Sequence, residues 1–370
     1  MMSSAKALVL VEPGRLEERE FPPPDLGEED GLLQVEACGL CGTDHEQFSG
    51  ALHPGYAFVP GHETVGVVVA AGRKAAERWG VEVGQRVAVE VFQSCRRCDE
   101  CEQGRYRFCR EHGIADMYGF VSVDREPGLW GGYSTHQYLA PDSMLLPVPD
   151  GLDPVTATLF NPLGAGVRWA SRLPQTGSGN VVAVLGPGIR GICSLVAAKE
   201  AGAEFVMVTG LGETDRLRLE VAREFGADVV VDVSGEDPVT VLHREVGSLA
   251  DVVVDVTAKA PRAFLQALDL VKPGGTVVVA GTRASGPLEG FDPDLLVFKE
   301  IRVLGALGVD ADSYLAAFEI LASGRYPFED LPRRVVGFGE LGGLLEAMAS
   351  GDPQRPLHAV VRPPGKDEFA

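Results

Sequence analysis

Four cysteines lie within fifteen residues of this 370-residue chain, close enough for their thiolates to surround one metal ion. They are spaced C-x2-C-x2-C-x7-C, at Cys95, Cys98, Cys101 and Cys109. Four thiolates hold Zn²⁺ tetrahedrally with sulfurs about 2.3 Å from the metal, and they leave no position for water. Two disulfides are the alternative, but a chain of this size does not need them. We therefore predict a structural zinc lobe at about residues 93–112.

A glycine-rich segment, GPGIRG, lies between the apolar run VVAVL and a helical pattern. In such a turn the first glycine allows the tight bend, the second lets the backbone approach a pyrophosphate, and the third lets helix and strand pack closely. The positive end of the helix then faces the phosphates. This context predicts an NAD(P) site that includes Gly186, Gly188, Ile189, Arg190 and Gly191.

The next apolar run, FVMVT, is followed by Gly210, where NAD-binding chains usually place an acid that binds the ribose 2′-hydroxyl. A missing carboxylate removes repulsion against a 2′-phosphate, and Arg216 or Arg218 could pair with one. Glu213 and Asp215 flank these arginines, so both could instead belong to a solvated helix face. We lean slightly toward NADP, with NAD as the alternative.

Two motifs nearer the N-terminus carry further zinc-ligand residue types, Cys41 in CGLCGTDHE and His62 in GHE. A thiolate and an imidazole suit zinc, although each alone is more often a core or loop residue. Together with GPGIRG and the four-cysteine segment, they resemble the zinc-containing medium-chain dehydrogenases/reductases of the alcohol dehydrogenase superfamily. The chain is most similar to the sorbitol and threonine dehydrogenase branch, over nearly its whole length.

The resemblance implies residue roles at a second, catalytic zinc. Cys41 and His62 match the zinc ligands, and Glu63 matches an acid beside the metal that can become a ligand. Thr43 matches the hydroxyl that relays the substrate alcohol's proton. Asp44 matches the acid that orients the zinc histidine. The resemblance also assigns the four-cysteine segment to a structural zinc lobe.

One position departs from the family pattern. The family takes its third zinc ligand from a Glu, Asp or Cys that opens a short motif, and here that motif, NPLGAG, opens with Asn161. Zn²⁺ with one thiolate, a neutral imidazole and an amide has a formal charge of +1, whereas a carboxylate would bring it to zero. Asn161 remains a candidate ligand and catalytic residue, but we predict that Glu63 enters the ligand set. A weak or absent zinc is the alternative.

A second departure from the family pattern concerns the proton relay. The branch often has a histidine five residues after the zinc cysteine, where this chain has Glu46, and His45 comes one position earlier. An imidazole ordinarily titrates near neutrality, which favours His45 as a shuttle, but a loop histidine is more often simply exposed. Both residues remain candidates.

These implied roles describe a zinc-dependent enzyme that interconverts an alcohol, secondary or benzylic, and its ketone or aldehyde by hydride transfer with NAD(P). A zinc-independent NADPH-dependent reductase of enoyl or quinone substrates is the alternative that Asn161 keeps open, and there Cys41 would be dispensable. A non-catalytic nucleotide-binding protein on the same scaffold is the third hypothesis.

The pattern of elements changes along the chain, as an α/β protein with two kinds of domain requires. Residues 1–155 alternate short β-rich runs with glycine and proline, which predicts an antiparallel, barrel-like domain, and the resemblance makes it the GroES-like catalytic domain. Residues 156–308 alternate apolar strands with helices, which predicts a Rossmann domain built on a doubly wound parallel sheet of six strands. Residues 309–370 contain two helical stretches and a late strand, and we expect them to return to the catalytic domain.

Composition limits the partners. Lys and Arg total 33 against 53 Asp and Glu, a net charge of −20, which repels nucleic acid and anionic membranes. No apolar run reaches membrane-spanning length, and Glu12 and Pro13 interrupt the N-terminal one, which predicts a strand and not a signal peptide. Seven cysteines, four of them assignable to metal, indicate a reducing cytoplasm, with Cys38 and Cys193 in the core. The resemblance implies a homodimer or homotetramer that acts on a small alcohol or carbonyl compound.

Overall fold

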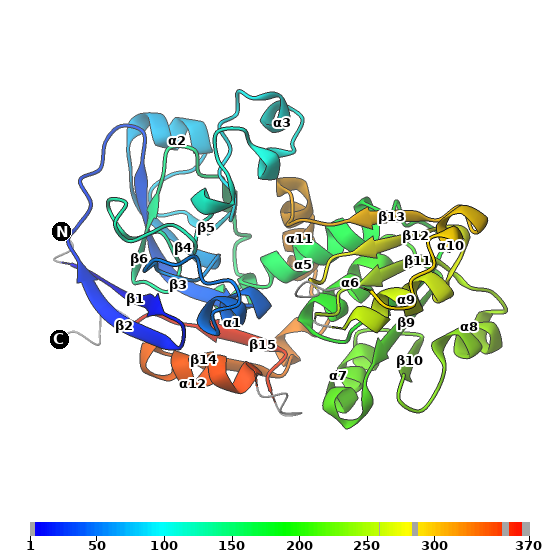
Figure 1. Ribbon diagram of the computed structural model, residues 1–370. Coiled ribbons are helices and arrows are strands. Elements are labelled where there is room, and N and C mark those ends of the chain that lie inside the picture. The colour runs from blue at the N-terminus through cyan, green and yellow to red at the C-terminus, as the bar shows by residue number, and fades with distance from the viewer. Residues whose placement is uncertain (1–3, 259, 283–287, 350–354, 365–370) are drawn as a thin grey trace. The chain divides into compact units, whose positions relative to one another are not determined.

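The computed structural model describes residues 4–258, 260–282, 288–349 and 355–364, and the chain forms two compact units (Figure 1). Unit 1 comprises Met1–Phe160 and Phe328–Ala370, and unit 2 comprises Asn161–Pro327. Among the helices of these described ranges, none is long and apolar enough to cross a membrane.

Unit 1 is built on a largely antiparallel sheet. Its strand order is β14-β15-β3-β4-β5-β7, with β6 also paired to β3, and only β14 and β15 run parallel to each other. A separate hairpin consists of β1 and β2. The strands are β1 (Ala5–Glu12), β2 (Arg15–Phe21), β3 (Gly31–Leu40), β4 (Glu63–Ala71), β5 (Arg86–Val89), β6 (His136–Leu139), β7 (Leu145–Pro147), β14 (Arg333–Val336) and β15 (His358–Val361). The predicted antiparallel organisation is confirmed.

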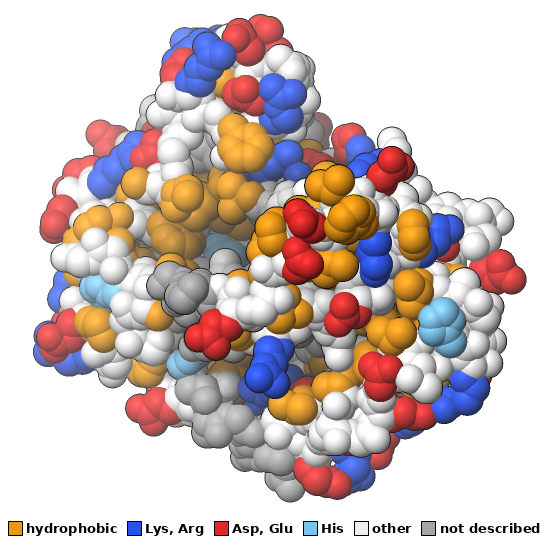
Figure 2. Space-filling model, turned by 45° about the vertical axis from the view of Figure 1, so that its right-hand side comes forward, with side chains coloured by type: hydrophobic (Ala, Val, Ile, Leu, Met, Phe, Trp, Pro, Cys, Tyr) orange, Lys and Arg blue, Asp and Glu red, His pale blue; other side chains and the backbone are white. Residues whose placement is uncertain are grey.

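Helices and 3-10 turns connect these strands. They are α1 (Gly42–Phe48), α2 (Arg73–Trp79), α3 (Asp99–Glu102), α4 (Pro154–Ala157) and α12 (Phe338–Ala349), with 3-10 turns η1 (Tyr106–Phe108), η2 (Ile114–Asp116) and η4 (Phe328–Asp330). The lobe that holds α3 stands at the top of Figure 1. In Figure 2 this lobe carries basic and acidic side chains side by side.

Unit 2 contains a six-stranded parallel sheet in the order β10-β9-β8-β11-β12-β13. This order, with two halves that diverge from the first strand, is that of a doubly wound dinucleotide-binding sheet. The strands are β8 (Val181–Leu185), β9 (Phe205–Gly210), β10 (Val229–Asp232), β11 (Ala250–Asp255), β12 (Val271–Val279) and β13 (Arg302–Gly305). The prediction of six parallel strands is therefore confirmed.

Helices follow the strands of this sheet, as the crossover connections between parallel strands require. They are α6 (Ile189–Glu200), α7 (Gly212–Glu224), α8 (Pro238–Val246), α9 (Pro261–Leu270), α10 (Asp294–Phe298) and α11 (Ala311–Ala322). A helical segment formed by α5 (Phe160–Gly166) and the π-helix η3 (Val167–Arg172) begins at the boundary between the two units.

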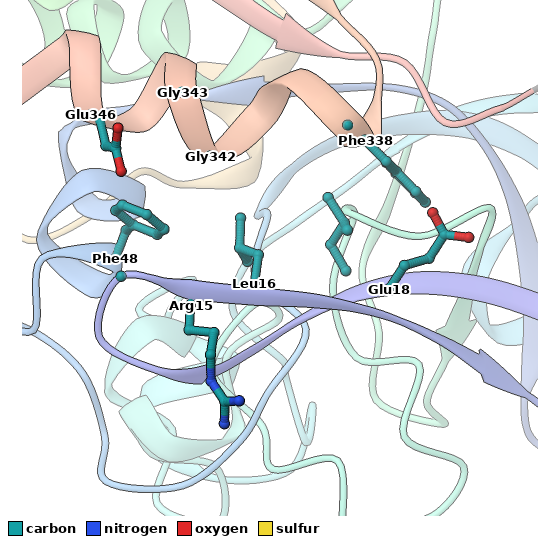
Figure 3. A pocket seen from close by; sticks show the side chains of 11 residues that line it. Arg15, Leu16, Glu18, Phe48, Phe338, Gly342, Gly343 and Glu346 are labelled. Carbon is teal, nitrogen blue, oxygen red and sulfur yellow. The ribbon is translucent and has the colours of Figure 1, made fainter.

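One apolar core of unit 1 lies where β1, the end of β3 and α12 meet. Phe58, Tyr133 and Leu341 are fully buried there. A groove of about 410 Å³ lies beside this core, between the β1–β2 hairpin and α12 (Figure 3). Leu16, Phe48 and Phe338 line it, with charged side chains at its rim. Cys38 and Cys193 are both fully buried, so their predicted place in the core is confirmed.

Candidate zinc and nucleotide sites

The four predicted cysteines converge in the α3 lobe. Cys98 precedes α3, Cys101 lies on it, and Cys109 follows η1. Their sulfurs all lie within 4.8 Å of one another, and the Sγ atoms of Cys95 and Cys101 are 3.8 Å apart. A tetrahedron with 2.3 Å metal–sulfur bonds has edges of about 3.8 Å. None of the seven described cysteines forms a disulfide, so the disulfide alternative is not observed.

Backbone N–H groups lie against all four of these sulfurs. The N–H groups of Arg110 and Cys101 lower the pKa of Cys98 to about 6. Burial raises the pKa of Cys95 to about 12, because a thiolate loses its hydration there. A divalent cation would offset that penalty, since it binds the deprotonated form. The donor set, the spacing and the amides all fit zinc.

Buried and partly buried polar contacts join the lobe to the rest of unit 1. His112 lies between two carboxylates, 3.1 Å from Asp116 and 2.9 Å from Asp142. Tyr106 donates a 2.7 Å hydrogen bond to Glu90, a carboxylate that is fully buried. These contacts hold the four cysteines in a fixed relation to the sheet.

The second group of possible metal ligands forms where β3 and β4 meet. Their antiparallel register pairs Gly39 with Glu63, which places Cys41, just after β3, beside His62, just before β4. The Sγ of Cys41 is 3.2 Å from the Nε2 of His62, and Cys41, His62 and Glu63 have ligand atoms within 4.8 Å of one another. All three side chains are buried.

The geometry of this group also fits zinc. Tetrahedral bonds of about 2.3 Å to sulfur and 2.0–2.1 Å to nitrogen put the two atoms about 3.5 Å apart, close to the observed separation of Cys41 and His62. The thiolate, the imidazole and the Glu63 carboxylate would together neutralise Zn²⁺. These three ligands alone balance the charge of the zinc ion.

Asp44 reaches the far side of the same histidine. Its Oδ2 accepts a 2.8 Å hydrogen bond from the N–H of Cys41, which begins helix α1 as its N-cap. Its Oδ1 lies 3.8 Å from the Nδ1 of His62. The Oδ1 of Asp44 and the Nδ1 of His62 are both buried and have no hydrogen-bond partner among the described residues.

The remaining relay candidates lie on α1. Thr43, His45 and Glu46 are all half-buried. The Nδ1 of His45 is buried and has no partner within the described part of the chain. The predicted proton-relay residues therefore share one short helix that begins at the metal-ligand candidate Cys41.

Asn161 has two partners within unit 2. Its Nδ2 donates to the hydroxyl of Tyr314 at 3.2 Å, and its Oδ1 accepts from the guanidinium of Arg190 at 3.2 Å. The Arg190 guanidinium also lies over the Trp169 ring, 5.3 Å from its centroid. The amide thus joins the predicted nucleotide-binding segment to α11.

The GPGIRG segment connects β8 to α6, as predicted. Gly186 has a φ of +102°, which L side chains rarely adopt. A Cβ on Gly191 would overlap the carbonyl oxygen of Gly186, so only glycine allows this approach. At Gly188, the N-cap of α6, a Cβ would meet no described atom within 4 Å, which leaves its backbone open to a ligand.

The end of β9 is crowded. A Cβ on Gly210 would lie 3.0 Å from atoms of Pro187, Asp215 and Leu219. Arg216 is bound by Glu213 at 3.0 Å and by Glu220 at 3.1 Å, and these carboxylates raise the pKa of Arg216. Its exposed side chain is therefore balanced by acids on its own helix.

The sequence did not indicate two neighbours of the Cys41 group. Phe120 lies with its ring centroid 6.2 Å from that of His62. Tyr133 is fully buried, and its ring abuts the backbone just before His62. The glycines in the GGY segment that contains Tyr133 were the only local signal, since they allow close backbone approach.

Comparisons with known proteins agree with this geometry. The model of the alcohol dehydrogenase GroES-like domain matches residues 27–150, and that of the zinc-binding dehydrogenase matches residues 191–323. A probable alcohol dehydrogenase of Mycobacterium tuberculosis is 62% identical over 360 residues, which cover 97% of this chain and 98% of the relative. An alcohol dehydrogenase of Geobacillus stearothermophilus is 33% identical, with 84% of this chain and 86% of the relative covered.

A solved structure shares the same architecture. It is a putative zinc-binding dehydrogenase from Sinorhizobium meliloti bound to NADP, 28% identical, with a TM-score of 0.82 and coverage of 98% of this chain and 100% of that one. Two sets of zinc-type ligands, the parallel sheet with its glycine-rich turn, and these full-length similarities lead to one assignment. The chain belongs to the zinc-containing alcohol dehydrogenase family of medium-chain dehydrogenases/reductases.

Proposed function

We propose that this protein oxidises a small secondary or benzylic alcohol, and reduces the corresponding carbonyl compound, with a catalytic zinc held by Cys41, His62 and Glu63. The observation that carries the proposal is the buried cluster of these three residues, one thiolate, one imidazole and one carboxylate within 4.8 Å. A thiolate, an imidazole and a carboxylate are the ligand types that Zn²⁺ prefers. The 62% identical relative named as a probable alcohol dehydrogenase supports the same activity.

Different residues of the chain have different roles in the proposed reaction. When bound, the zinc acidifies the alcohol and the nicotinamide accepts a hydride. Thr43 takes the proton from the alcohol oxygen, and His45 or Glu46 passes it to solvent. Asp44 holds the imidazole of His62 with its Nε2 toward the metal. Phe120 lies beside His62, with its ring tilted against the imidazole.

Glu63 is the third ligand in this proposal, in place of the acid that the family supplies where this chain has Asn161. Glu63 begins β4 and is 1% exposed, so its carboxylate is held at the site by the sheet. Asn161 is proposed to act elsewhere, because both its amide groups bind residues of unit 2.

The cofactor site uses the turn between β8 and α6. We place the pyrophosphate against Gly186, Gly188 and the first turn of α6, where Ile189 and Arg190 begin the helix. Gly210 lacks the acid that would repel a 2′-phosphate, which supports a slight preference for NADP. Arg216 would have to leave Glu213 and Glu220 to bind that phosphate.

The choice of cofactor is measurable. If Arg216 binds a 2′-phosphate, Arg216→Ala raises KM for NADP and leaves KM for NAD unchanged. Equal effects on both cofactors, or none, would assign the arginine to the helix surface alone.

Zinc analysis with a matched pair of cysteine variants tests the activity. Cys41 is a proposed ligand, whereas Cys38, three residues earlier on β3, is a buried core residue. We expect two zinc ions per wild-type chain, one in Cys41→Ala, and two in Cys38→Ala. Alcohol-dependent reduction of NAD(P) should disappear in Cys41→Ala only. Enone reduction that survives Cys41→Ala would instead support the zinc-independent reductase.

We also propose a cytoplasmic homo-oligomer. Seven described cysteines without a disulfide, four of them grouped for metal, support a reducing compartment. Val297 and Phe298 are 72% and 81% exposed next to the edge strand β13, and apolar surface of this kind is typical of a subunit interface. Light scattering measures the molecular mass of the wild type and of Phe298→Asp. We expect the wild type to be a dimer or tetramer and the variant to have a smaller mass.

A further inference from the structure

Several buried polar atoms near the Cys41 group have no hydrogen-bond partner among the described residues, and three of them belong to the side chains around His62. They are the Oδ1 of Asp44, the Nδ1 of His62 and the hydroxyl of Tyr133. The side chains are 2%, 7% and 0% exposed. A buried polar group without a partner is unfavourable, so three of them in one region call for a common explanation.

The backbone fixes Tyr133 beside His62. The N–H of Tyr133 binds the carbonyl of Pro60 at 3.0 Å, and the N–H of Gly132 binds the carbonyl of Gly61 at 2.9 Å. Gly61 has a φ of +91°, and a Cβ there would lie 2.6 Å from the Cδ1 of Tyr133. The tyrosine ring therefore rests directly on the backbone that leads into His62.

The negative charge of Asp44 acts on the buried hydroxyl of Tyr133. Burial raises the pKa of Tyr133 well above its usual value, and the charge of the Asp44 carboxylate is the next cause. The Oδ2 of Asp44 already accepts from the N–H of Cys41. Its Oδ1 is the acceptor that remains, and one carboxylate oxygen can accept two hydrogen bonds.

We infer that Tyr133 is a positioning residue for the catalytic zinc: its hydroxyl and the Nδ1–H of His62 both donate to the Oδ1 of Asp44. This arrangement satisfies all three atoms at once. It keeps the proton of His62 on Nδ1, so that Nε2 presents its lone pair beside the Sγ of Cys41. The inference rests on the proposed zinc site of Cys41, His62 and Glu63.

We expect Tyr133→Phe to weaken zinc binding at the catalytic site while the protein still folds. A phenylalanine keeps the ring against Gly61 but removes one of the two donors that hold the carboxylate. Loss of a direct partner of a zinc ligand typically weakens metal binding by 10–100-fold. Tyr133 acts one residue further out, so we expect about a threefold to tenfold weakening.

The experiment compares Tyr133→Phe with Tyr118→Phe in the full-length protein. Tyr118 is also fully buried, and its hydroxyl binds Ser143 at 2.5 Å and accepts from the N–H of Ala140 at 2.9 Å. Zinc release to a chromogenic chelator is measured for each of the two metal ions per chain. Only Tyr133→Phe should release the catalytic zinc faster, with the four-cysteine zinc unchanged in both variants.

A double-mutant cycle with Asp44→Asn tests whether Tyr133 acts on the zinc site through Asp44. If Tyr133 acts through Asp44, adding Tyr133→Phe to Asp44→Asn has no further effect on zinc release. Additive effects, wild-type zinc release in Tyr133→Phe, or equal acceleration in Tyr118→Phe would each overturn the inference. A wild-type protein with only the four-cysteine zinc would overturn the proposed function together with it, and metal analysis of the wild type distinguishes that case.

Discussion

Replacing Glu63 with glutamine should remove the catalytic zinc while leaving the fold intact. The change keeps the size of the side chain and deletes one negative charge. With Glu63 in the ligand set, Zn²⁺, one thiolate and one carboxylate sum to zero. With glutamine the buried site carries a charge of +1, and a buried charge without compensation is strongly unfavourable.

The structure sets the size of the effect. Three ligand atoms within 4.8 Å of one another place a central ion no more than about 2.8 Å from each. The gross attraction between Zn²⁺ and a carboxylate at that distance is about 12 kcal/mol at an effective dielectric constant of 20. Desolvation of the carboxylate and ligation by the glutamine oxygen offset most of it. Breaking a buried charge pair costs about 3–5 kcal/mol, which corresponds to a weakening of zinc binding between about a hundredfold and a few thousandfold.

Metal analysis after dialysis against buffers of fixed free zinc measures this directly. Glu36→Gln is the matched control, because Glu36 lies on β3 and its carboxylate binds Arg86 at 2.6 Å and 2.9 Å. We expect two zinc ions per chain in the control and one in Glu63→Gln. If Glu63→Gln holds both ions as tightly as the wild type, Glu63 is not a ligand and the charge argument is wrong.

Three further changes test other parts of the structure. Cys98→Ser should remove the structural zinc and lower the melting temperature, while Cys41 keeps its metal; zinc counts and calorimetry would refute this if both ions remain. Gly191→Ala places a Cβ against the carbonyl oxygen of Gly186, so we expect the Kd for NAD(P) to rise at least about tenfold, with both zinc ions retained. Fluorescence titration measures this Kd, and unchanged cofactor binding would contradict the predicted role of the turn. Burial, and then the charge of Arg333, lower the pKa of His358 to about 3. The unfolded chain therefore binds a proton that the folded one excludes, and stability is full above about pH 6.5 and falls by about 1.4 kcal/mol per pH unit below it. His358→Gln should flatten denaturant-derived stability between pH 6.5 and 4 relative to the wild type, and parallel profiles would show that His358 does not contribute.

Much of the chemistry was visible in the sequence, because it is encoded over short distances. The spacing of Cys95, Cys98, Cys101 and Cys109 requires only tight local turns to bring four sulfurs together. The order strand, GPGIRG, helix likewise fixes a local turn whose glycines have individual steric reasons. Apolar strands without polar alternation predicted a parallel sheet, since such strands are covered on both faces.

The sequence could not specify contacts that depend on strand register or on distant segments. Cys41 and His62 meet because β3 pairs with β4 with Gly39 opposite Glu63, and a shift of one residue would separate them. Asn161 was predicted as a possible metal ligand from its place in a family motif, and only the fold shows that its amide binds Arg190 and Tyr314.

The sequence by itself therefore determined the family, the two-part α/β organisation and the types of ligand, because each of these is written in local spacing and periodicity. The tertiary structure alone decided which buried groups complete the site. Tyr133 comes from a segment far along the chain and lies against the backbone just before His62, through backbone hydrogen bonds and a glycine contact that no local pattern contains. Local patterns fix which groups are available, and long-range packing fixes which of them share a buried space.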